Sequence, residues 1–132
     1  VPTLRMKGVV GSVVSTGGGV LIAQTFTVTV SNPGSGNVYF IDSVQQDTVN
    51  LTEGNTYRFD QSDSSNSGHP LRFSTTSNGT HGGGTQYTTG VTTNGTPGSA
   101  GAYTQITVAS GAPTLYYYCT NHSGMGGQAN TP

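Results

Sequence analysis

The most reactive side chains in the sequence lie in one short segment near its C-terminal end. Cys119, His122 and Met125 bring a thiol, an imidazole and a thioether within seven residues of one another. Glycines stand close to Met125 on both sides, and glycine lets a backbone turn tightly because it has no side chain. A short loop of this kind can turn all three side chains toward one point, as a mononuclear metal site requires.

A second histidine is needed to complete the ligand set. His69 is the best candidate, because it stands at the start of a predicted strand and Pro70 stiffens the backbone directly after it. His81 lies in a glycine-rich segment and is predicted to be exposed. A thiolate, two imidazoles and a long axial thioether form the ligand set of a blue-copper centre. Zinc fits these residues less well, because methionine is a poor ligand for zinc.

Each of these residues alone has a simpler explanation. A single cysteine at a strand end is most often a small buried hydrophobic residue, and a lone histidine or methionine usually belongs to a loop or to the core. Their joint position is more informative. The only cysteine, one of two methionines and two of three histidines fall where one site needs them. We therefore predict a copper site formed by His69, Cys119, His122 and Met125.

Alternating apolar residues predict the strands that position these ligands. The predicted elements are strands at 25–30 and 38–41, a hairpin at 48–60, a strand from about 71, and strands at 102–108 and 115–119. The last strand ends at Cys119. Residues 74–101 hold almost no aliphatic side chain and are predicted to form a long loop. After Cys119 the sequence shows no further strand pattern.

The chain is predicted to consist of one domain, residues 25–132, preceded by an N-terminal arm, residues 1–24. The arm holds two short apolar runs, Val9–Val14 and Val20–Ile22. Neither run can bury itself alone, so we expect one of them to dock on the sheet or on another subunit. A start at Val1 suggests a processed chain or an excised part of a longer one.

The composition favours β structure and excludes several kinds of partner. Ser, Thr, Gly and Asn make up half of the 132 residues, which supports short strands and turns rather than helices. The four Lys and Arg residues are too few for binding to nucleic acid or an anionic membrane surface. No apolar stretch is long enough for a transmembrane helix, and the five scattered acidic residues form no catalytic pair. We expect no nucleic-acid partner, no membrane insertion and no enzymatic activity.

Residues 26–127 resemble the cupredoxin family, the small blue-copper proteins such as plastocyanin and amicyanin. The segment 67–70, Ser-Gly-His-Pro, is similar to the one that supplies the family's first histidine, and 116–125 is similar to its Tyr-x-Cys-x2-His-x(2–4)-Met loop. The resemblance implies an all-β Greek-key β-sandwich. It also implies one Cu(I)/Cu(II) ion with Cys119, His69 and His122 as trigonal ligands and Met125 as the weak axial ligand. In the family a further strand follows the methionine loop, and this sequence predicts none. The closing strand is therefore expected to be absent, or to be replaced by the arm or by a neighbouring chain.

Two functions follow from the resemblance. The first is electron transfer with a redox partner, through His122 near the loop surface. The second is a structural or assembly module in which copper only stabilises the fold or is not bound. Closely similar Gly- and Thr-rich domains look like parts of predicted virion proteins of marine bacteriophages, and such a module would meet other protein subunits through the arm or an open sheet edge. The scarcity of Lys and abundance of Thr, Ser and Gly suggest an extracellular, periplasmic or virion-surface location.

Overall fold

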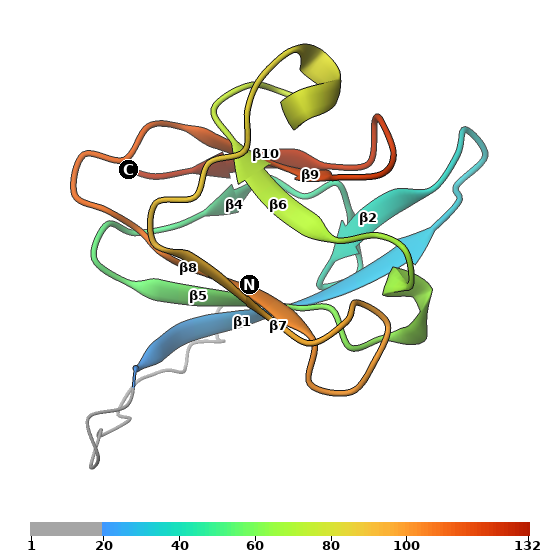
Figure 1. Ribbon diagram of the computed structural model, residues 1–132, viewed down its shortest axis with the longest axis horizontal. Helices are drawn as coiled ribbons and strands as arrows, with labels where there is room; N and C mark the ends of the chain where they lie inside the picture. The colour runs from blue at the N-terminus through green and yellow to red at the C-terminus, as the bar shows by residue number, and fades with distance from the viewer. Residues whose placement is uncertain (1–19) are drawn as a thin grey trace.

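The computed structural model describes residues 20–132, which are almost entirely β-strands and turns (Figure 1). The strands in chain order are β1 (Ile22–Ser31), β2 (Val38–Ile41), β3 (Val44–Gln45), β4 (Val49–Asn50), β5 (Thr56–Asp60), β6 (Leu71–Ser74), β7 (Val91–Asn94), β8 (Tyr103–Thr107), β9 (Leu115–Cys119) and β10 (Gly127–Asn130). Two short 3₁₀ turns, η2 (Ser64–Asn66) and η3 (Gly79–Gly82), lie in the connections before and after β6.

Hydrogen bonds join these strands into two sheets (Figure 1). One sheet has six strands in the order β3-β2-β1-β5-β8-β7, and the other has four in the order β4-β10-β9-β6. Both sheets are mixed, because β1 runs parallel to β5 and β10 runs parallel to β4, while the other pairs are antiparallel. The predicted all-β sandwich is confirmed, and its Greek-key connectivity stays a prediction.

Aromatic side chains fill much of the space between the sheets, and Phe59 is central among them. Phe59 lies on β5, with its ring centroid 4.8 Å from that of Phe26 on β1 of the same sheet. Across the interface its ring lies 5.4 Å from Phe73 on β6 and 6.4 Å from Tyr117 on β9. All four side chains are buried. Each buried ring removes a large apolar area from water, so a chain with few aliphatic residues still forms a core.

The segment 48–60, predicted as a hairpin, instead crosses from one sheet to the other. β4 pairs with β10 in the four-stranded sheet, and β5 lies between β1 and β8 in the six-stranded sheet. The hairpin prediction is wrong because Val49 and Leu51 before the turn and Tyr57 and Phe59 after it all face the same core. The alternation of apolar and polar residues is therefore the same whether the two segments pair as a hairpin in one sheet or belong to two facing sheets.

Residues 74–101, predicted as a structureless loop, contain regular elements. They include η3, strand β7 paired with β8, and an isolated bridge between Phe73 and Tyr87. β7 lies at the edge of its sheet, with Val91 partly buried and its other three residues exposed. An edge strand of this kind is held mainly by its ladder to the neighbouring strand, so it leaves no apolar alternation in the sequence.

A closing strand follows the methionine loop, although the sequence predicts none. β10 pairs antiparallel with β9 on one edge and parallel with β4 on the other. Of its four residues only Ala129 is buried, so the strand shows no apolar pattern and is held by backbone hydrogen bonds on both edges. The expectation that the arm or a neighbouring chain replaces this strand is therefore wrong.

The first strand begins at Ile22, inside the segment predicted as an arm. Val20 and Leu21, just before it, are exposed, and Val9–Val14 lie outside the described residues. Docking of these apolar runs on another subunit stays a prediction. In the part of the chain that the structure describes, no helix is long and apolar enough to cross a membrane.

Candidate metal centre

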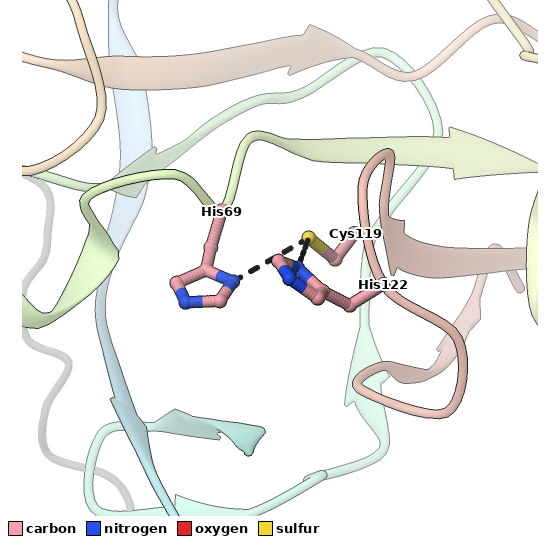
Figure 2. A group of neighbouring side chains, drawn as sticks. All are labelled: His69, Cys119 and His122. Carbon is pink, nitrogen blue, oxygen red and sulfur yellow. Dashed lines mark hydrogen bonds between the residues drawn. The ribbon is translucent and has the colours of Figure 1, made fainter.

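Two neighbouring strands bring the cysteine and the first histidine together. Cys119 is the last residue of β9, and the first residue of β6 lies opposite it in the antiparallel pair. A hydrogen bond of 3.2 Å from the Thr120 N–H to the Pro70 carbonyl continues this pairing beyond the strands. His69 therefore arrives beside Cys119, and the loop from β9 to β10 turns His122 toward both (Figure 2).

The side chains of His69, Cys119 and His122 converge (Figure 2). Cys119 Sγ lies 3.7 Å from Nδ1 of His69 and 3.6 Å from Nδ1 of His122. The centroids of the two imidazole rings are 4.7 Å apart, and one ligand atom from each of the three residues lies within 4.8 Å of the other two. This group could hold a metal ion, as the sequence predicts for these three residues.

The distances fit a single ion placed between the three side chains. In zinc sites, for comparison, bonds to a thiolate sulfur are about 2.3 Å long and bonds to an imidazole nitrogen about 2.0–2.1 Å. With bond angles of about 110–120°, such bonds hold the sulfur and nitrogen atoms about 3.6–3.8 Å apart. Both observed separations, 3.7 and 3.6 Å, lie in this range. Both sulfur–nitrogen separations are therefore compatible with one ion bound by Cys119 and the two histidines.

The three side chains differ in exposure. Cys119 has no exposed surface and His69 is only 9% exposed, whereas His122 is exposed. Burial lowers the pKa of His69, and the nearby His122 lowers it further. A lower pKa keeps the imidazole neutral, which is the form that binds a metal. The centre thus has a closed interior and one potential ligand at the surface.

Met125, the fourth predicted ligand, lies in the interior. It has no exposed surface and belongs to the same hydrophobic cluster as Cys119. A buried thioether in the loop that also carries His122 is available as a weak additional ligand. Its coordination to a metal stays a prediction.

Two buried amide side chains that the sequence does not reveal fix the backbone of His69. Gln61 Nε2 donates to the His69 carbonyl at 2.7 Å and to Asn66 Oδ1 at 3.0 Å, and Gln61 Oε1 accepts the Leu71 N–H at 3.0 Å. The Tyr39 hydroxyl donates to the same His69 carbonyl at 2.7 Å. No sequence pattern marks Gln61 or Asn66, because Asn and Gln are mostly exposed in proteins.

Side chains outside the ligand set also hold the loop from β9 to β10. Asn78 Nδ2 donates to Ser123 Oγ at 2.8 Å, and Asn78 Oδ1 accepts the Gly124 N–H at 2.9 Å. Asn121 Nδ2 donates to the Gly68 carbonyl at 3.0 Å, next to His69. The loop is therefore fastened both to the segment around η3 and to the segment that carries the first histidine.

His81 is exposed, as predicted, but it is not without contacts. Its Nε2 lies 2.8 Å from the Cys119 carbonyl oxygen. Because a carbonyl oxygen only accepts, Nε2 carries the proton in this hydrogen bond. The His81 ring also meets the Tyr118 ring edge-on, with centroids 6.2 Å apart. His81 thus supports the end of β9 from outside and does not join the group of His69, Cys119 and His122.

Comparisons with protein-family models, curated proteins and solved structures gave no match to this chain. The site is therefore characterised by its own geometry. A β-sandwich holds one buried thiol between two imidazoles at a spacing that can bind a metal ion.

Proposed function

We propose that this chain is a copper-binding domain of the cupredoxin type. His69, Cys119 and His122 would bind one copper ion, with Met125 as the weak axial ligand. The observation that carries the proposal is the pair of sulfur–nitrogen distances, 3.7 and 3.6 Å, around one buried thiol. Bound copper would supply a one-electron Cu(I)/Cu(II) couple. The residues of the chain orient the ligands and keep water away from the sulfur.

The donor chemistry favours copper over zinc. A thiolate, two imidazoles and a thioether suit copper. A structural zinc site uses four ligands, usually Cys and His and sometimes a carboxylate, and among the described residues three such side chains meet here. The buried Met125 offers a soft fourth donor, which copper accepts and zinc does not favour.

The same features support electron transfer. A site whose ligands are held in place by their surroundings changes little between oxidation states. Three hydrogen bonds provide this support. Gln61 donates to the His69 carbonyl, Asn121 donates to the Gly68 carbonyl, and the Gly124 N–H donates to Asn78. The exposed His122 lies in a surface hollow of about 490 Å³, so electrons would enter and leave through its imidazole.

The burial of Cys119 argues against a catalytic thiol. A nucleophilic cysteine is usually partly exposed, because its substrate must reach the sulfur. Cys119 has no exposed surface and lies under the two histidines. A ligand role fits this position better than a nucleophilic one.

Copper titration of the purified protein tests the proposal. Wild-type protein should bind one Cu(II) ion per chain and develop an intense thiolate-to-copper absorption band in the visible range. Cys119→Ser should abolish the band. His69→Asn should also abolish it. The matched control His81→Asn should keep it, because His81 contacts the backbone carbonyl of Cys119 and not its thiol. Wild-type protein that binds no copper would contradict the proposal.

A further inference from the structure

Three successive carbonyl groups around Met125 accept hydrogen bonds from the region of β2 and β3. Gln46, directly after β3, donates from Nε2 to the Gly124 carbonyl at 3.1 Å and to the Gly126 carbonyl at 2.9 Å. The Tyr39 N–H donates to the Met125 carbonyl at 2.9 Å. We call these three contacts the carbonyl clamp. The clamp fixes the backbone on both sides of the Met125 side chain.

Gln46 makes these contacts from an uncommon backbone conformation. Its φ angle is 47°, in the left-handed region that few residues other than glycine adopt. Its N–H donates to the Tyr39 carbonyl at 2.8 Å, so both its main chain and its amide are held. Residues persist in this region when surrounding contacts determine their conformation, and they are frequent at functional sites.

The strand β9 encloses the same segment from the other side. A methyl group at Gly126 would overlap the Tyr117 carbonyl oxygen. A methyl group at Gly127 would lie 2.8 Å from both the Gln46 carbonyl oxygen and the Tyr117 hydroxyl. The backbone after Met125 therefore has no room to shift toward β9 or toward Gln46.

The position of Gln46 indicates that the clamp acts locally. Gln46 is half-buried and borders two surface hollows, so water can take the place of its amide if the side chain is removed. Gln61, by contrast, is 1% exposed and water cannot replace it. Removal of the Gln46 amide should therefore loosen the Met125 segment without unfolding the protein.

We propose that Gln46 is a positioning residue for Met125, which sets the distance of the thioether from the metal and so tunes the reduction potential. This inference rests on the proposed copper site, because the axial ligand is one of the groups that tune the potential of such a centre. A thioether donates electron density and stabilises Cu(II). A looser Met125 should therefore raise the potential.

The test compares Gln46→Leu, which keeps a similar volume and removes the N–H donors, with Gln86→Leu at an exposed position. Gln45 is unsuitable as the control because its Nε2 donates to Gln46 Oε1 at 3.4 Å. In copper-loaded protein, Gln46→Leu should raise the potential toward that of Met125→Leu and change the relative intensities of the visible bands. Gln86→Leu should do neither. In a Met125→Leu background, Gln46→Leu should cause no further shift. An equal shift in that background, or no shift in either, overturns the inference.

Metal-free protein provides a second readout that separates this inference from the proposed function. With ¹³C-labelled methionine methyl groups, Gln46→Leu should shift or broaden the Met125 signal, and Gln86→Leu should leave it unchanged. Wild-type protein without bound copper would overturn the proposed function and with it the tuning of the potential, but not the positioning of Met125 by Gln46. An unchanged Met125 signal in Gln46→Leu would overturn the clamp itself, whatever the copper result.

Discussion

Gln61 and His69 are joined by a buried hydrogen bond, in which Nε2 of Gln61 lies 2.7 Å from the His69 carbonyl oxygen. The same amide meets Asn66 in η2 and the N–H of Leu71 at the start of β6. One side chain thus joins the segment after β5 to both ends of the connection that carries the first histidine. The Gln61 side chain thereby fixes the backbone position from which the His69 side chain extends.

Replacing this amide should destabilise the fold. We expect Gln61→Leu to lower the free energy of unfolding by about 2–4 kcal/mol, because it leaves several buried donors and acceptors without a partner. Chemical denaturation measures the change. The exposed control Gln45→Leu should stay within about 0.5 kcal/mol of wild type. A similarly small effect for Gln61→Leu would mean that water satisfies these groups.

Substitutions at Gly126 and Gly111 should separate the effect of close packing from the effect of a backbone conformation that favours glycine. Gly126→Ala should destabilise the protein by about 1–3 kcal/mol and weaken copper binding, because the added methyl group overlaps the Tyr117 carbonyl. At Gly111 the φ angle is 74° and the space around it is open, so Gly111→Ala should cost about 1 kcal/mol through strain alone and leave copper binding intact. Equal copper affinity in the two variants would contradict this account.

Two buried tyrosines should make the fold sensitive to alkaline pH. Burial raises the pKa of Tyr39 and Tyr117 well above the usual range, and Cys119 adds to the shift for Tyr39 as Asp47 does for Tyr117. The unfolded chain ionises these groups near pH 10. The stability they provide should be complete below about pH 10 and fall above it, by about 1.4 kcal/mol per pH unit for each tyrosine.

Denaturation of metal-free protein between about pH 8 and pH 11 measures this dependence. Tyr39→Phe should be less stable at neutral pH, because the hydrogen bond to the His69 carbonyl is lost, and should show a shallower decline above pH 10. An identical slope in wild type and Tyr39→Phe would show that Tyr39 ionises equally in the folded and unfolded states.

Electron exchange through His122 should depend weakly on salt. The nine residues that line the hollow at His122 include no Asp, Glu, Lys or Arg. Rates with a small anionic oxidant should therefore change by less than about twofold between about 0.01 and 0.2 M salt. Asn37→Lys places a charge at this hollow, and its rate should fall with added salt. A steep dependence in wild type would place the electron route elsewhere.

Features that depend on side-chain type and on local pattern, such as strands and candidate ligands, can be predicted from the sequence. Alternation of apolar residues locates the strand that ends at Cys119. The spacing to His122 indicates a common site, and the structure brings Cys119, His122 and His69 together in a group that could hold a metal ion. Gln46 and Gln61 escape prediction because their roles depend on amide contacts with distant backbone carbonyls. A polar residue carries no local sign that it will be buried or bound in this way.

β10 illustrates the same limit for a whole strand. Its residues Gly-Gln-Ala-Asn have low strand propensity, and only pairing with β9 and β4 makes them a strand. Register between segments that lie far apart in the chain is a tertiary property. Local pattern can show that Val49 is apolar, but not that it lies opposite Ala129.

The order in which the chain is synthesised adds a constraint on maturation. β10 is the last of the described strands to leave the ribosome, yet it lies between β4 and β9 and pairs with both. Until it emerges, the segment with His122 and Met125 lacks the strand pairing that holds its C-terminal end. A nascent chain that pauses before this point would leave the Cys119 thiol open to oxidants. Metal loading should therefore follow translation of β10.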